Sequence, residues 1–125
     1  MPRTLVPALV ALCALLACQP TNPLVGSYVA NISGEQGGIP RELKLDLNGD
    51  SSARLSISFG GGSISSVQQG TWKTEGEQIQ VRLTQINGRP LQGGDITFEI
   101  QGRQLVSTKW DPELYGADGL KLVRP

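Results

Sequence analysis

Apolar and polar residues alternate with a period of two along most of the chain after residue 25. Such alternation places apolar side chains on one face of a β-strand and polar side chains on the other. In the clearest example, Leu43, Leu45 and Leu47 alternate with charged residues. The pattern predicts eight short strands, over residues 25–32, 42–47, 53–59, 66–74, 78–83, 96–100, 104–110 and 120–124.

Turn residues separate these strands and determine how they pair. The turn Asn48-Gly49-Asp50 lies between two alternating runs and predicts a hairpin. Because every connection before the longer loop at residues 111–119 is short, each strand is expected to pair with its predecessor in an antiparallel up-and-down meander. Such a meander can close into a small, filled β-barrel and so remove its edges. A two-sheet β-sandwich has the same pattern and is the alternative.

The first eighteen residues are organised like an export signal. Arg3 gives the start a single positive charge, residues 5–16 are almost wholly apolar, and Ala17 precedes Cys18. The apolar run is shorter than the roughly 20 residues that a membrane-spanning helix needs. Leu15, Ala17 and Cys18 resemble a lipobox, the cleavage motif of bacterial lipoproteins. The resemblance implies cleavage between Ala17 and Cys18 and a diacylglyceryl group on Cys18.

This interpretation divides the chain into three parts. Residues 1–17 are the signal peptide, residues 18–24 are the lipidated cysteine and a proline-containing linker, and residues 25–125 are one β-domain. Two or more acyl chains hold a protein firmly at a membrane without spanning it. We therefore expect a lipid-anchored protein of the bacterial cell envelope. By analogy with other lipoproteins, Gln19 after the cysteine is compatible with the outer membrane, if the organism has one.

The composition restricts function more than fold. The chain contains no histidine, and neither of its two cysteines stays free, because Cys13 leaves with the signal and Cys18 carries lipid. The commonest general base, the thiolate nucleophile and the soft metal ligands are thus missing. Eleven basic and eleven acidic residues alternate without the basic stripe of a nucleic-acid binder. We expect no enzyme, cofactor, metal site or nucleic-acid partner.

A few residues are candidates for chemistry or binding. The segment from Asp46 to Asp50 begins like a calcium loop, but Ser51 stands where that loop needs glycine, so a hairpin turn is the better interpretation. Trp110 and Tyr115 flank two carboxylates in the 111–119 loop and are possible contacts for a ligand or partner. The aromatic side chains of a small β-domain are otherwise expected in its core or as plugs of a barrel.

The order of these landmarks resembles the small lipocalin-like barrels of bacterial lipoproteins, including the N-terminal barrel of the copper-resistance lipoprotein NlpE. The resemblance implies a fold, an envelope location and an arginine, Arg124, that caps an aromatic ring at the closed end. The Cys-x-x-Cys motif of that barrel is absent, so copper or redox sensing does not carry over. The matching segments are Gly26-Ser27-Tyr28, Leu43-x-Leu45-x-Leu47-x-Gly49, Gly70-Thr71-Trp72, Ile79-x-Val81-x-Leu83 and Leu120-x-Leu122-Val123-Arg124.

These observations predict a non-catalytic binding domain held at a membrane through the lipid on Cys18. Its ligand is expected to be an envelope protein or a small apolar molecule. The alternative is a carbohydrate- or surface-interaction module on a β-sandwich, with Trp110 and Tyr115 as its platform.

Overall fold

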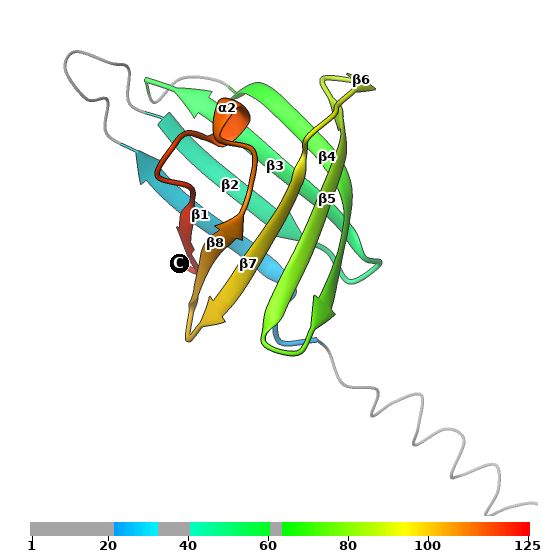
Figure 1. Cartoon of the computed structure of the whole chain (residues 1–125), viewed down its shortest axis with the longest axis vertical. Coiled ribbons are helices and arrows are strands. Elements are labelled where there is room, and N and C mark those ends of the chain that lie inside the picture. The colour runs from blue at the N-terminus through cyan, green and yellow to red at the C-terminus, as the bar shows by residue number, and fades with distance from the viewer. Residues whose placement is uncertain (1–21, 33–40, 61–63) are drawn as a thin grey trace, which may run out of the picture.

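The computed structural model describes residues 22–32, 41–60 and 64–125, and it shows a closed, all-β barrel (Figure 1). Eight antiparallel strands form the wall in the order β4-β3-β2-β1-β9-β8-β7-β5, and β5 pairs with β4 to close the ring. The predicted meander barrel, lipocalin-like in topology, is confirmed, and the β-sandwich is excluded. The strands are β1 (Gly26–Ile32), β2 (Arg41–Leu47), β3 (Ser52–Phe59), β4 (Ile64–Glu75), β5 (Gln78–Ile86), β7 (Asp95–Gln101), β8 (Gln104–Lys109) and β9 (Lys121–Val123), with β6 (Arg89–Pro90) as a two-residue addition to β5.

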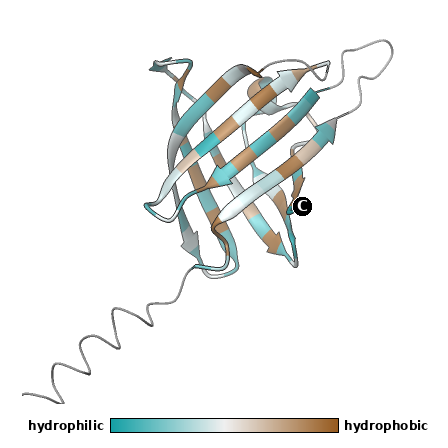
Figure 2. Cartoon of the chain, turned by 180° about the vertical axis from the view of Figure 1, so that it is seen from behind, coloured by the Kyte–Doolittle hydropathy of each residue, from teal (hydrophilic) through white to brown (hydrophobic). Residues whose placement is uncertain are grey.

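The alternation of the sequence matches the two faces of the wall, as the bands along the strands in Figure 2 illustrate. On β2, Leu43, Leu45 and Leu47 are buried, whereas Lys44 between them is exposed. Buried hydrophobic residues from all eight wall strands form one cluster in the described part of the chain. Burial of one such side chain stabilises the fold by about 1.5–3 kcal/mol. The alternation in the sequence places Leu45, Leu55, Val81, Phe98 and Leu122 on the inward face and Lys44, Arg54, Arg82 and Glu99 on the outward face. In the structure the first five are all buried and the other four are all exposed.

Gly70 lets β4 and β5 approach closely where the wall bends. A Cβ atom on Gly70 would lie 1.8 Å from the carbonyl oxygen of Arg82. The register of β4 against β5 also shifts between Gln69 and Gly70, which marks a β-bulge. Bulges bend a strand and increase its twist. Glycine is therefore required at this position by the close contact between the two backbones.

Arg124 and Tyr28 close the end of the barrel at which the chain enters β1. The guanidinium carbon of Arg124 lies 5.5 Å from the centroid of the Tyr28 ring, within cation–π range. Nη1 of Arg124 donates to the carbonyl oxygen of Pro23 at 2.5 Å, and Nη2 donates to that of Val25. The hydroxyl of Tyr28 donates to the carbonyl oxygen of Leu24 at 2.9 Å. The expected cap by Arg124 on an aromatic ring is thus confirmed.

The 111–119 segment, expected as a loop, contains one turn of helix, α2 (Pro112–Tyr115). Asp111 is its N-cap, and the Asp111 carboxylate accepts a hydrogen bond from the Glu113 N–H at 2.9 Å. Aspartate at the N-cap and proline in the first turn are both favoured helix starts. The loop prediction was wrong here because it did not use this local signal.

Phe59 also departs from the expected pattern. The alternation predicts that Phe59 faces inward like Ile57, but 43% of its surface is exposed. Phe59 is the last residue of β3, and the register of β3 against β4 shifts between Ile57 and Ser58. The strand has therefore already left the core when it reaches this aromatic residue.

Candidate functional site

The predicted lipidation site lies outside the described residues. Ala17, Cys18 and the whole signal segment belong to residues 1–21, and the description begins at Asn22. Asn22 precedes β1 at the closed end of the barrel (Figure 1). Within the described residues, no helix has the length and apolar character needed to cross a membrane. Lipidation therefore stays a prediction.

Tyr115 plugs the opposite end of the barrel. Its side chain is buried, and its hydroxyl donates to Oε1 of Gln68 at 2.6 Å. Gln68 lies on β4, across the ring from the connection that carries α2, and it is also buried. Burial raises the pKa of Tyr115, and the carboxylates of Asp111 and Asp95 raise it further. The phenol therefore stays protonated and serves as a donor that fixes α2 to the far wall.

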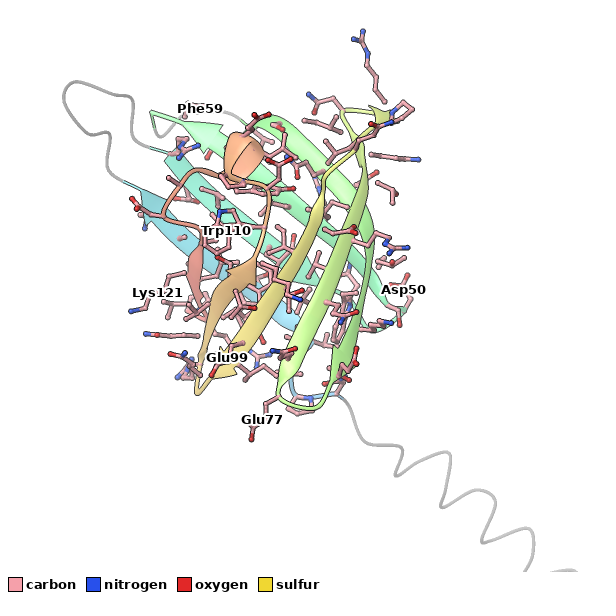
Figure 3. The ribbon with its side chains drawn as sticks, in the orientation of Figure 1. Asp50, Phe59, Glu77, Glu99, Trp110 and Lys121 are labelled. Carbon is pink, nitrogen blue, oxygen red and sulfur yellow. The ribbon has the colours of Figure 1, made fainter. Side chains whose placement is uncertain are left out.

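Trp110 lies beside this plug but serves a different contact (Figure 3). Its indole is partly buried, and Nε1 donates to the carbonyl oxygen of Gly116 at 2.8 Å. The ring also packs so closely on Gly119 that a Cβ there would lie 2.9 Å from it. Because Tyr115 is buried, Trp110 and Tyr115 do not form an exposed pair of rings. Their positions give no support to the predicted carbohydrate platform.

The pairing of β1 with β9, called the seam, is the shortest strand pairing in the described wall. The two strands pair only at Val29 and Val123. In antiparallel strands, the N–H and C=O of alternate residues point to opposite neighbours. The carbonyl of Leu120 accepts a hydrogen bond from the N–H of Ser107 at 2.9 Å. The backbone N–H and C=O groups of the even-numbered residues of this segment therefore point toward β8. The backbone groups of Lys121 and Val123 therefore face β1.

The next pair of residues along the seam, Asn31 and Lys121, does not continue the β1–β9 pairing. Asn31 would be the partner of Lys121 if the β1–β9 register continued, but the pairing ends at Val29 and Val123. Even-numbered residues of β1 pair toward β2, so the N–H and C=O of Asn31 point into the seam. Among the described residues, neither Asn31 nor Lys121 has a strand partner on this side.

A cleft of about 680 Å³ opens at this point of the seam. Its charged residues are Arg41, Asp118 and Lys121, so its walls carry one net positive charge. Tyr115 packs in the core and also lines the cleft, so its side chain separates the cleft from the core. The pattern of the sequence carried no signal for this cleft, except that the last strand is short. The lining residues are Ala30, Asn31, Arg41, Val106, Ser107, Tyr115, Gly116, Ala117, Asp118, Gly119, Leu120 and Lys121.

A second hollow, of about 490 Å³, lies on the outer face of the wall over β4, β5, β7 and β8. Lys73, Arg82 and Lys109 contribute positive charge there. Arg82 is paired with Asp95 at 3.4 Å, and both side chains are about 70% exposed. Exposed pairs of this kind contribute little and are screened by salt. This hollow is therefore a solvated part of the wall.

The acidic residues at the end of β2 and in the turn after it have structural roles. Asp46 accepts a hydrogen bond from the hydroxyl of Ser27 at 2.6 Å. Asp50 accepts two from Ser52, through its hydroxyl at 2.6 Å and its N–H at 3.0 Å, and these bonds lower the pKa of Asp50. In the described ranges, no three His, Cys, Asp or Glu side chains gather as a metal site would require.

No protein-family model, curated protein or solved structure matches this chain. The barrel shares its topology with lipocalin-like domains, while the closer resemblance to the NlpE barrel stays a prediction. The α2 plug and the seam cleft share Tyr115 at the end of the barrel away from the start of β1, and this end is the candidate site.

Proposed function

We propose that this protein is a lipid-anchored, non-catalytic binding domain of the bacterial cell envelope, which presents one end of its barrel to a protein partner. The observation that carries the proposal is that the chain enters the barrel at one end, whereas the candidate binding features lie at the other end. The chain enters at the closed end, beside Arg124 (Figure 1). The seam cleft lies toward the other end, as do Phe59 and Ile64, two of the three large apolar side chains that are exposed among the described residues; the third is Val123, next to Arg124.

The short linker supports this orientation. Four peptide units join Cys18 to Asn22, and a fully extended chain of that length spans at most about 14 Å. Beyond Asn22, the carbonyls of Pro23 and Val25 are held by Arg124. A lipid on Cys18 would thus keep the closed end within about 14 Å of the membrane surface and direct the α2 end away from it.

Exposed apolar side chains at the distal rim support a protein partner. Phe59 at the end of β3 is 43% exposed, and Ile64 at the start of β4 is 54% exposed. Apolar side chains grouped at one place on a surface mark protein contacts more often than isolated ones do. The buried cluster fills the barrel with side chains from every wall strand, which favours a surface contact over a ligand inside the barrel.

The anchor is tested by Cys18→Ser. We expect this variant to stay unprocessed or to leave the membrane fraction, because Cys18 is the residue that would carry the lipid. Processed Cys18→Ser protein that still sediments with membranes would contradict the proposal.

The orientation and the partner are tested by photo-crosslinking in living cells. A photoreactive amino acid at Ile64 is expected to yield a discrete adduct with an envelope protein. The same probe at Glu77, on the turn between β4 and β5 at the closed end, is the matched control and should yield none (Figure 3). Equal adducts at both sites, or an adduct at Glu77 alone, would reject a partner at the distal end.

A further inference from the structure

We infer that the seam cleft is a slot for an extended peptide segment of a partner protein, which adds as a strand beside β1 and pairs with the backbone of Asn31. This inference rests on the proposed function in that the partner is a protein. It adds where that protein binds and in what conformation.

The backbone of the seam supports a peptide as occupant. Asn31 on β1 and Lys121 on β9 each direct an N–H and a C=O into the cleft, and neither meets a strand there within the described residues. Each of these two positions therefore offers one donor and one acceptor to another backbone. Strand addition to an open sheet edge is an established way to bind extended peptides.

The side chains around the slot indicate what the peptide carries. Ala30 and Val106 make part of its wall apolar, and Arg41 and Lys121 outnumber the single acidic residue Asp118. Side chains of an added strand point alternately toward the barrel and toward solvent. Ala30 and Arg41 are in phase with the buried residues of their strands, and Val106 and Lys121 are in phase with the exposed ones, so each face of the slot offers one apolar and one basic contact. The preferred segment therefore combines small apolar residues with acidic residues that pair with Arg41 and Lys121.

The defined probe is a ten-residue peptide in which valine alternates with glutamate. It is titrated into the protein purified from membranes in detergent, and binding is followed by calorimetry. We expect saturable binding with a micromolar Kd. The same peptide N-methylated on its valines cannot donate those hydrogen bonds and should bind at least tenfold more weakly. A lysine-for-glutamate version should also bind at least tenfold more weakly, and Lys121→Glu should reverse this charge preference.

The matched protein variants are Asn31→Pro and Asn31→Thr. Proline removes the N–H that points into the seam and leaves the β1–β2 hydrogen bonds intact, because those use even-numbered residues of β1. Threonine keeps the N–H and suits a strand. Asn31→Pro should bind the valine–glutamate peptide at least tenfold more weakly with little change in Tm, and Asn31→Thr should bind like the wild type.

Amide hydrogen exchange tests the slot without any variant. In the free protein, the amide of Asn31 should exchange much faster than that of Ala30, which points to β2, and the valine–glutamate peptide should slow it. Protection of Asn31 equal to that of Ala30 in the free protein would overturn the inference, as would no peptide binding up to millimolar concentration. Saturable binding of oleate, equal in the wild type and Asn31→Pro, with no binding of the peptide, would assign the cleft to a lipid chain instead. Crosslinking at Ile64 with a failed peptide test would reject only the slot.

Discussion

Replacement of Arg124 by alanine should cost about 3 kcal/mol of unfolding free energy, because this side chain holds three parts of the closed end together. Arg124→Ala removes two hydrogen bonds to the carbonyls of Pro23 and Val25 and the cation–π contact with Tyr28. Hydrogen bonds from charged groups contribute about 1.5–3 kcal/mol each, and a partly exposed cation–π contact about 0.5–1 kcal/mol. Because the guanidinium is partly exposed, we take a total slightly below the sum of the lower ends of these ranges.

Gly26 provides a second, independent way to break the same contacts. Its φ of +149° is unusual for residues with a side chain, and a Cβ atom there would lie 2.6 Å from Nη2 of Arg124. Gly26→Ala should therefore displace the guanidinium and destabilise the domain by a similar amount. Since both substitutions remove the same interactions, the double variant should cost at least about 1 kcal/mol less than the sum of the two.

Urea unfolding followed by tryptophan fluorescence measures these differences. A loss of about 3 kcal/mol in a domain of this size should also lower Tm by more than about 10 °C. Arg103→Ala is the control, because that side chain makes one exposed hydrogen bond, to the carbonyl oxygen of Pro125 at 3.0 Å, and its loss should cost under about 1 kcal/mol. An Arg124→Ala effect no larger than that of Arg103→Ala, or strict additivity with Gly26→Ala, would show that Arg124 does not hold the closed end together.

Three further predictions follow from the interior and the composition. Leu45→Ala should cost about 2–5 kcal/mol in a urea melt, whereas Lys44→Ala on the same strand should cost under about 0.5 kcal/mol, and the reverse order would mean that the register is wrong. Burial raises the pKa of Tyr115 above its ordinary value of 10.0, so folding keeps its phenol protonated; the contribution of Tyr115 to stability should be constant up to about pH 10 and then fall as the unfolded chain ionises, so that Tyr115→Phe shows a smaller fall above this pH. Copper and zinc titrations by calorimetry should show no stoichiometric micromolar site, because the chain has no histidine and the proposed cleavage and lipidation would leave no free thiol.

The wall of the barrel was predictable from the sequence because the patterns that specify its strands and turns involve residues that are close together in the chain. Alternation at 43–47 and 79–83 fixes which face of each strand is buried, and short turns fix which strands are neighbours. The helical turn at Pro112 was also readable, since Asp111 and Pro112 form a standard helix start. This helical turn was missed because it has only four residues, although the signal for its start is present.

The candidate site was not predictable in the same way, because it depends on contacts between distant segments. Gln68 and Tyr115 are 47 residues apart, and nothing near Gln68 shows that its amide lies inside a barrel. The unpaired backbone of Asn31 likewise depends on where β9 leaves β1 and follows β8. Alternation specifies faces, but it does not specify where a pairing between distant strands ends.

The seam also determines the order in which the barrel can fold. Seven of the eight pairings in the ring join strands that are close in sequence, whereas β1 with β9 joins distant parts of the chain. The bonds from Arg124 to Val25 and Pro23 span 99 and 101 residues. Contacts of such long sequence separation form slowly. A chain that emerges from a membrane pore with its N-terminal part first would therefore hold an open, curved sheet with β1 and β8 as free edges until residues 121–124 arrive, and during this interval it would be most prone to aggregation and most in need of a chaperone.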